Sequence, residues 1–214
     1  MVTPELALMG YLPRDLLMNA GFVRRSGEML ARIAAELAGA PPLLAGVATP
    51  NPSDMGRPLF NSAVLLRNGA VGPAFHKTLL PTYDVFDEDR YFDRRNNVQP
   101  LEFKGERLGI HICEDAWNDP ELWPRQRMYE YDPVAELAAK GATILINISA
   151  SPFSKGKEQV RYRLISRHAQ RHRLPFVYAN QVGGNDELIF DGRSFCAKKC
   201  SATWRGNTAC RWFS

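Results

Sequence analysis

A glutamate, a lysine and a cysteine, each set in an apolar stretch, are the residues of this sequence that could together break a bond at a carbonyl carbon. Cys113 lies in the stretch GIHICEDAWND, where alternating small and apolar residues precede it and two acids follow it. A thiol attacks a carbonyl only if a base removes its proton and another group stabilises the charge that develops on the substrate. Glu5, in TPELAL, is a candidate base, and Lys77, in FHKTLLPTY, is a candidate for stabilising an oxyanion.

The elements around these residues are predicted to place them at strand ends. Apolar residues alternate with small or polar ones in the stretch RLGIHI, residues 107–112, which predicts a strand that delivers Cys113 to its carboxyl end. Two extended runs flank Asn68 and Gly69, a pair that favours a tight hairpin, so Lys77 is predicted to end a strand. Ligands of layered α/β sheets usually bind at such ends.

The rest of the chain alternates helical and extended patterns, which is typical of a layered α/β fold. We expect a helix at 26–38 with Ser26 as its N-cap, a strand at 41–48, a helix at 132–141 with Asp132 as its N-cap, a strand at 142–149, a helix at 157–173 and a strand at 174–183.

Composition and charge limit the classes of function that this sequence can have. The 214 residues, 45% hydrophobic and 23% charged, fit a globular protein of one large or two small domains. No apolar run is long enough to cross a membrane, and the first residues lack a secretory signal, so we expect a cytoplasmic protein. The basic stretch 161–173 is predicted to be a solvated helix face and not a nucleic-acid site, and the net charge of +4 is modest.

Five motifs, in this order along residues 3–195, resemble the carbon-nitrogen hydrolase (nitrilase-like) superfamily. They are TPELALMGYLPRDLL, FHKTLLPTYDVFDEDRYF, GIHICEDAWND, INISASPFSKGK and ANQVGGNDELIFDGRSF. Within the superfamily, these motifs are most similar to the glutamine-hydrolysing domains of glutamine-dependent NAD synthetases. The resemblance implies a four-layer αββα sandwich and a triad in which Glu5 is the general base, Lys77 stabilises the oxyanion and Cys113 is the nucleophile.

The resemblance also implies a reaction and a set of further site residues. The side-chain amide of glutamine is hydrolysed to glutamate and ammonia through a thioester on Cys113. The backbone N–H of Glu114 faces the oxyanion together with Lys77, and Glu88 is a second acid that supports this lysine. The residues expected to help hold glutamine are Tyr83, Phe86, Ser151 and Lys157.

The partners that the resemblance implies are glutamine and an ATP-dependent NAD synthetase domain or subunit, which would use the ammonia to make NAD from deamido-NAD. The amidase reaction itself needs no cofactor. ATP and Mg would belong to the synthetase domain, whose glycine-rich SGGxDS loop is not found in these residues. We further expect a homo-oligomer that binds neither nucleic acid nor membrane.

Three alternatives compete with this interpretation. His111 stands two residues before Cys113, and because such side chains share a strand face, a cysteine-histidine hydrolase is one of them. The others are a free-standing amidase acting on another small amide, and a non-catalytic fragment or binding module with the same fold. The presence of all three triad residues argues against the binding module.

The ends of the sequence depart from the family pattern. An opening strand and helix are expected before the first motif, and the pattern is lost after Phe195, so we expect a hydrolase domain at 1–195 that is incomplete at its N-terminus and a divergent tail at 196–214. The domain is thus expected to be truncated at both ends. The tail holds Cys196, Cys200 and Cys210, but no obvious fourth ligand, so no metal site is predicted.

Overall fold

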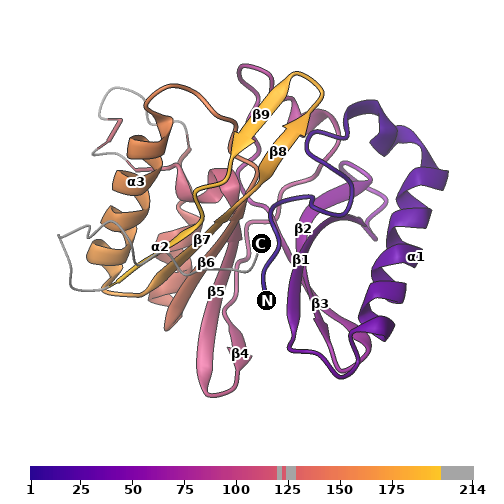
Figure 1. The fold of residues 1–214 in the computed structure, drawn as a ribbon, viewed down its shortest axis with the longest axis horizontal. Coiled ribbons are helices and arrows are strands. Elements are labelled where there is room, and N and C mark those ends of the chain that lie inside the picture. The colour runs from indigo at the N-terminus through magenta and orange to yellow at the C-terminus, as the bar shows by residue number, and fades with distance from the viewer. Residues whose placement is uncertain (120–121, 124–128, 199–214) are drawn as a thin grey trace.

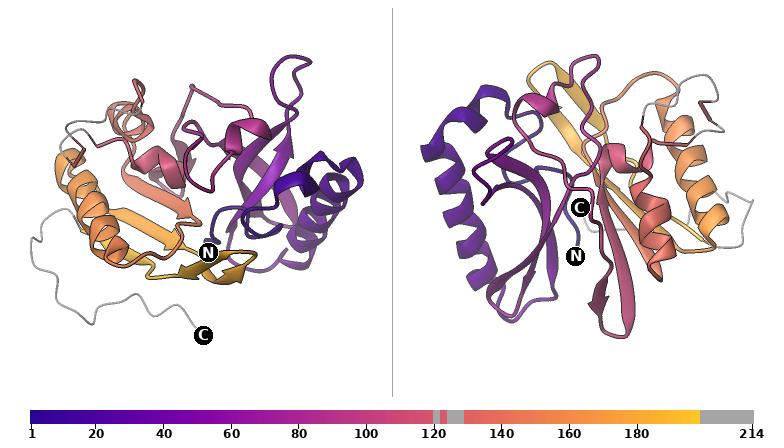
Figure 2. Two further views of the ribbon diagram at one scale, coloured as in Figure 1. Left: turned by 90° about the horizontal axis from the view of Figure 1, so that it is seen from above. Right: turned by 180° about the vertical axis from the view of Figure 1, so that it is seen from behind.

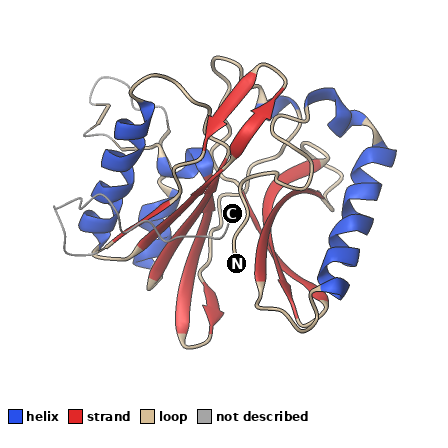
Figure 3. Cartoon of the chain, viewed as in Figure 1, coloured by secondary structure: helices blue, strands red, loops and turns tan. Residues whose placement is uncertain are grey.

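The computed structural model describes residues 1–119, 122–123 and 129–198. These residues form four layers: helix α1 on one outside, two stacked sheets, and helices α2 and α3 on the other outside (Figures 1 and 2). The predicted αββα sandwich is confirmed. Figure 3 shows that both outer faces are helical while the strands occupy the interior.

The first sheet is an antiparallel meander covered by α1. Its strands are β1 (Leu43–Pro50), β2 (Leu59–Arg67) and β3 (Ala70–His76). Asn68 and Gly69 turn between the last two strands with φ angles of 53° and 78°, which confirms the predicted hairpin.

The helix that covers this sheet, α1 (Ala20–Glu36), begins six positions before the predicted start at Ser26. Asn19 is its N-cap and accepts a hydrogen bond from Phe22 N at 3.1 Å. Ser26 lies inside the helix, where its hydroxyl donates to Phe22 O at 3.0 Å, so its assignment as N-cap was wrong. The apolar stripe did not mark the start, because residues 24–28, which include Arg24, Arg25 and Glu28, separate Val23 of the first turn from the apolar residues that begin at Met29.

The second sheet has a parallel centre and antiparallel edges. Its order is β10 (Phe195–Ala197), β7 (Phe176–Asn180), β6 (Ile144–Ser149), β5 (Glu106–Ile112) and β4 (Leu101–Phe103), in which β5, β6 and β7 are parallel neighbours. The helices α2 (Pro133–Ala139) and α3 (Lys157–His172) connect these three strands. The predicted order of strand, helix, strand, helix and strand is confirmed, as is Asp132, which caps α2 by accepting from Ala135 N.

A hairpin, β8 (Val182–Asn185) and β9 (Leu188–Asp191), follows β7, and three short 3-10 turns complete the described elements: Arg14–Met18, Glu88–Arg90 and Cys113–Ala116. The apolar core fills the space between the layers. Isoleucines of β5 and β6 pack with Ala63 of the first sheet, while Phe176 and Tyr178 of β7 pack on the helix side. Burial of these side chains fixes the stacking of the sheets.

Helix α3 does not present all of its basic residues to solvent. Arg161 and His168 are only 2% and 1% exposed, so the predicted solvated face covers only part of the segment. Arg161 pairs with Asp191 of β9 and donates to Ser151 O at 3.2 Å. Among the helices in the described ranges, none is long and apolar enough to cross a membrane.

Candidate active site

Cys113 stands at the carboxyl end of β5, as predicted, where the chain leaves the strand. It is the first residue of the turn Cys113–Ala116, and its φ of 43° lies in the left-handed region. Such a backbone is uncommon for a residue with a side chain, and it persists only where the surroundings hold it. The left-handed backbone ends the strand and redirects the thiol from the β5 register.

Glu5 reaches the interior because its backbone passes directly over β1. A Cβ on Gly46 would lie 2.1 Å from Pro4 O, so only glycine permits this approach. The Glu5 side chain is fully buried. Its Oε2 accepts from Ala150 N at 3.0 Å, and its Oε1 accepts from Asn61 Nδ2 at 2.7 Å. These donors fix the carboxylate in one orientation.

Lys77 follows the last residue of β3 and is also fully buried. Its Nζ donates to Glu5 Oε1 at 2.7 Å and to Glu88 Oε1 at 2.8 Å. Glu88 is held in turn by Tyr11, whose hydroxyl donates to the same oxygen at 2.7 Å. The ammonium therefore lies between two carboxylates, which offset the cost of burying its charge.

The electrostatics of this cluster act directly on the thiol. Burial raises the pKa of Cys113 well above its ordinary value, the charge of Glu5 adds to this, and Lys77 acts in the opposite direction. Burial alone would lower the pKa of Lys77, but Glu5 and Glu88 outweigh it and raise that pKa. Burial also raises the pKa of Glu88 to about 7, against the effect of Lys77. The thiol is thus protonated at neutral pH and needs a base.

A second group of polar side chains surrounds Glu114, the residue after the cysteine. The hydroxyl of Tyr83 donates to both Glu114 carboxylate oxygens at 3.0 and 2.9 Å, and Tyr129 donates to one of them at 3.1 Å. Burial raises the pKa of Glu114, while Lys77 and the tyrosine hydroxyls lower it. These hydroxyls fix the orientation of the Glu114 carboxylate.

The remaining predicted substrate contacts lie around this group. The Nζ of Lys157 stands 5.5 Å from the centre of the Trp117 ring, and burial lowers its pKa while the nearby Cys113 and Glu114 raise it. Phe86 packs against Tyr83, with ring centroids 5.7 Å apart.

Ser151 is placed by its backbone. It is 3% exposed, and its N donates to Asn180 Oδ1 at 2.8 Å. The residue before it, Ala150, holds Glu5, so Ser151 lies one residue from a contact of the predicted base. The structure thus brings Glu5, Lys77 and Glu88 into direct contact beside Cys113 and groups the other predicted residues around Glu114 and Ala150; the roles of all of them stay predictions.

The cysteine-histidine alternative was wrong. His111 lies on the helix side of β5, where its ring meets that of Phe176 edge-on at 5.2 Å, and its Nδ1 faces Gly109 O at 3.1 Å. The neighbouring isoleucines and Cys113 belong to the core between the sheets. The expectation of a shared face fails because the chain leaves the strand at Cys113.

Sequence reasoning missed several partners of the cluster. Tyr11 and Asn61 hold Glu88 and Glu5, and Asp115 accepts three backbone hydrogen bonds beside them. Asn61 carries a signal that could have been used, because it is a polar residue in a mostly apolar strand whose first eight residues are buried. Asp115 stands two residues after the cysteine in the same motif. Tyr11 shares its motif with Glu5 but has no local mark of its role.

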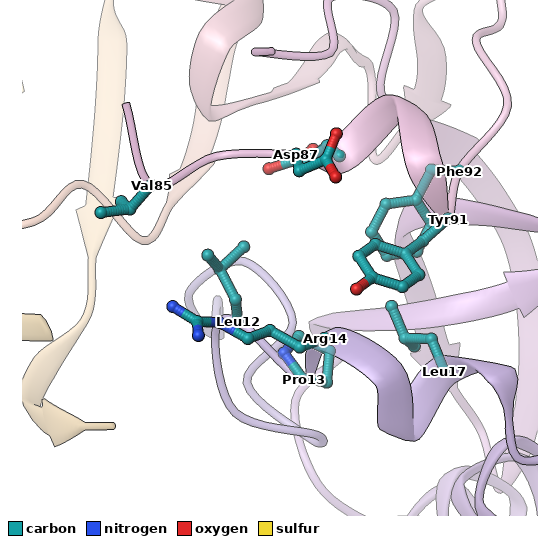
Figure 4. A pocket seen from close by; sticks show the side chains of 9 residues that line it. Leu12, Pro13, Arg14, Leu17, Val85, Asp87, Tyr91 and Phe92 are labelled. Carbon is teal, nitrogen blue, oxygen red and sulfur yellow. The ribbon is translucent and has the colours of Figure 1, made fainter. Parts of the chain in front are cut away.

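A cavity of about 280 Å³ opens beside this cluster (Figure 4). Its walls are Leu12, Pro13, Arg14, Leu17, Val85, Asp87, Glu88, Tyr91 and Phe92. Glu88 joins this cavity to the ion pairs of Lys77, whereas Cys113 does not line it.

No group of three or more histidine, cysteine or acidic side chains in the described part of the chain is arranged to hold a metal ion. Cys196 belongs to β10, and Cys200 and Cys210 lie outside the described residues.

Known proteins are similar to this chain in sequence and in fold. The family model for carbon-nitrogen hydrolases matches residues 1–199. A glutamine-dependent NAD(+) synthetase of Synechocystis sp. is 46% identical over 198 residues, which are 91% of this chain and 35% of that protein. The chain therefore spans about a third of the length of the curated relatives it matches.

Solved structures agree. Glutamine-dependent NAD+ synthetase from Acinetobacter baumannii superposes with a TM-score of 0.77 at 32% identity, over 92% of this chain and 34% of that one. Carbon-nitrogen hydrolase from Helicobacter pylori G27 superposes with a TM-score of 0.70 at 22% identity, over 92% of this chain and 69% of that one, and shows the same fold.

Proposed function

Because this chain belongs to the carbon-nitrogen hydrolase family, we propose that it hydrolyses the side-chain amide of glutamine to glutamate and ammonia through a thioester on Cys113. The observation that supports this most is the fully buried ammonium of Lys77, held 2.7 Å from Glu5 and 2.8 Å from Glu88 beside the cysteine. A buried base and a buried cation beside a thiol are suited to acyl transfer.

The first half of the reaction forms the thioester. Glu5 takes the proton of the Cys113 thiol, and the thiolate attacks the amide carbon of the substrate. Lys77 and the backbone N–H of Glu114 stabilise the oxyanion. The proton held by Glu5 then passes to the nitrogen, and ammonia leaves as the carbon-nitrogen bond breaks.

The second half releases glutamate. Glu5, again unprotonated, takes a proton from a water molecule, and the resulting hydroxide attacks the thioester carbon. The same donors stabilise the second oxyanion, and as the carbon-sulfur bond breaks Glu5 gives its proton to the sulfur and returns the thiol of Cys113. One carboxylate therefore acts as base and acid in both halves.

Preference for glutamine comes from charges at the opposite end of the substrate. We assign the α-ammonium group to the Glu114 carboxylate and the α-carboxylate to Lys157. The assignment is supported by the orientation of Glu114 by Tyr83 and Tyr129 and by the half-buried position of Lys157. We assign Phe86 and Ser151 to further contacts with glutamine. A simple aliphatic amide carries neither charge, so it gains neither contact and binds less tightly than glutamine.

The names of the curated relatives indicate a use for the ammonia. Several curated relatives are glutamine-dependent NAD(+) synthetases, and this chain corresponds to about a third of each. We therefore assign the ammonia to an ATP-dependent synthetase domain or subunit that makes NAD from deamido-NAD. ATP and Mg belong to that partner.

The test is a substrate comparison with the 214-residue chain. Ammonia and glutamate are measured after incubation with glutamine, and ammonia after incubation with asparagine or propionamide, with Cys113→Ala as the blank. The proposal predicts turnover of glutamine well above both other amides. Equal or faster turnover of propionamide would favour the free-standing amidase, and a folded chain that hydrolyses none of the three would favour the binding module.

A further inference from the structure

Asp115 joins the two segments that carry the predicted nucleophile and the predicted oxyanion lysine. Its Oδ1 accepts from Thr78 N at 3.0 Å and from Leu79 N at 2.8 Å, and its Oδ2 accepts from Ile112 N at 2.9 Å. The side chain is 1% exposed. The first two donors directly follow Lys77 in the chain, and the third directly precedes Cys113.

These two segments have no ladder between them. Lys77 lies at the end of the first sheet, where its N donates to Asn61 O at 2.8 Å, and Cys113 lies at the end of a strand of the second sheet. From Thr78 onward the chain leaves the ladder of β3, and its next two N–H groups turn to Asp115. The two segments share no backbone hydrogen bonds of a strand pair, and the Asp115 carboxylate links them instead.

Other contacts hold the cysteine turn without reaching the lysine. Asn147 Nδ2 donates to Cys113 O at 3.4 Å, and His168 Nε2 lies 2.7 Å from Ala116 O, both from the second sheet and its covering helices. Among the side-chain hydrogen bonds of the described residues, those of Asp115 alone tie the turn to the backbone that follows Lys77.

We propose that Asp115 is a positioning residue that fixes the Lys77 ammonium relative to the Cys113 thiol and thereby sets the rate of thioester formation. The inference rests on the proposed function for the roles of Lys77 and Cys113. Asp115 touches neither the thiol nor the substrate; it acts through the backbone on each side of them. A shift of about 1 Å between reacting groups costs on the order of a hundredfold in rate, so a loss of this clamp is measurable.

The charge of Asp115 determines how many hydrogen bonds its side chain can accept. Burial raises the pKa of Asp115 to about 7, and the backbone N–H donors together with Lys77 act against this shift. As an anion, Asp115 accepts all three hydrogen bonds. An asparagine at the same place has one oxygen and one NH₂ group, so it must present a donor to at least one of the backbone N–H groups.

The experiment compares Asp115→Asn with Asp132→Ala in the full chain. Asp132 also accepts a backbone N–H, from Ala135 at 2.9 Å, but it caps α2 and touches neither segment, so it controls for a general loss of stability. Three readouts are taken at a temperature where thermal melts show both variants folded. They are kcat and KM for glutamine, the rate of Cys113 alkylation by iodoacetamide followed by peptide mass, and the pH dependence of that rate.

The proposal predicts that Asp115→Asn lowers kcat on the order of a hundredfold while KM changes little, because the amino acid pocket is untouched. It also predicts slower alkylation at pH 7 and a higher midpoint of the alkylation profile, because a displaced Lys77 stabilises the thiolate less. Asp132→Ala keeps the wild-type kcat and profile. An unchanged alkylation profile in folded Asp115→Asn, or an equal kcat loss in both variants, would overturn the proposal.

A further variant and two combinations of results keep the experiment decisive. If Asp115→Asn does not fold, Asp115→Glu keeps the charge and moves it by one methylene; a wild-type kcat and alkylation profile in that variant overturns the proposal, and a reduced kcat supports it. If the wild-type chain hydrolyses no glutamine but Asp115→Asn still slows alkylation of Cys113, the positioning role stands and the proposed substrate falls. If the wild-type chain hydrolyses glutamine and Asp115→Asn is alkylated normally, the substrate stands and the positioning role falls.

Discussion

Lys77 Nζ lies 2.7 Å from Glu5 Oε1, and neither side chain has any exposed surface, although 72 residues separate them in the chain. A buried ion pair gains little stability over apolar packing, because desolvation offsets most of its attraction. Its presence in the core is better explained by chemistry than by folding. The proposed base and oxyanion group hold each other in place before substrate arrives.

Replacing Glu5 by glutamine tests the base. The variant keeps the shape of the side chain and an oxygen that accepts from Lys77, but it cannot take a proton from Cys113. General base catalysis contributes roughly 10²–10⁴-fold, so we expect kcat for glutamine to fall by about this factor. Steady-state kinetics and a thermal melt measure the two effects. A folded Glu5→Gln variant with more than half of the wild-type kcat would show that another group removes the proton.

Replacing Glu88 by glutamine tests the second carboxylate. With the pKa of Glu88 raised to about 7, this group loses its charge as pH falls through neutrality and then holds Lys77 less firmly. We expect the wild-type kcat to decline as pH drops through about 7. The Glu88→Gln variant should have a lower kcat at every pH and a shallower decline, because only Asp115, whose pKa burial also raises to about 7, still titrates there. Parallel profiles of kcat against pH from 6 to 9, taken with matched buffers, decide the point; an identical limb in the variant assigns it to another group.

Replacing Glu114 by glutamine tests recognition of the α-ammonium group. The amide keeps hydrogen bonding to Tyr83 but removes the negative charge, so glutamine should bind less tightly while binding of propionamide, which has no ammonium group, should not change. Loss of a charged hydrogen bond costs about 1.5–3 kcal/mol, which corresponds to an increase of about 10- to 150-fold in KM. The two substrates serve as controls for each other. Equal changes for both would mean that Glu114 acts on the chemistry and not on the substrate's charge.

Replacing His111 by leucine tests the stability of the layer behind the cysteine. Burial lowers the pKa of His111 to about 3, whereas an unfolded histidine titrates near 6.5. Between these values the unfolded chain binds more protons, so the wild type loses stability as pH falls below 6.5. At pH 5 this one group accounts for about 2 kcal/mol of that loss.

The His111→Leu variant should therefore unfold with a smaller dependence on pH. The measurement is urea unfolding of both proteins at pH 8, where the histidine is neutral in either state, and at pH 5. The other titrating groups are common to both proteins and cancel in the comparison. If the two free energies of unfolding fall in parallel from pH 8 to pH 5, His111 is not kept neutral by the fold.

Local patterns were sufficient to predict the elements that carry the site. The alternation before Cys113 located the end of β5, Asn68 and Gly69 located the hairpin that leads to Lys77, and Asp132 located the start of α2. Each of these signals depends on residues within one element. The start of α1 was missed because charged residues at 24–28 interrupt the apolar pattern between Val23 and Met29.

The contacts inside the site depend on how two sheets stack, and periodicity within one strand does not encode that. Asn61 lies 56 residues from Glu5, and Tyr11 lies 77 residues from Glu88, yet both pairs are hydrogen bonded. His111 shows that alternation within a strand also misleads where the strand ends. Strand alternation places it on the face of Cys113 only if the strand continues, and the left-handed φ at Cys113 ends it.

The central claim is that Cys113 forms a glutamyl thioester, and mass spectrometry of the acid-quenched chain tests it most directly. Glu5→Gln and wild-type protein are mixed with glutamine, quenched within one turnover, and digested at low pH. The account predicts one glutamyl group, on the peptide that contains Cys113, in the wild type, and little or none in Glu5→Gln. Glutamate production with no acylated Cys113, or acylation on Cys196, Cys200 or Cys210 instead, would contradict it.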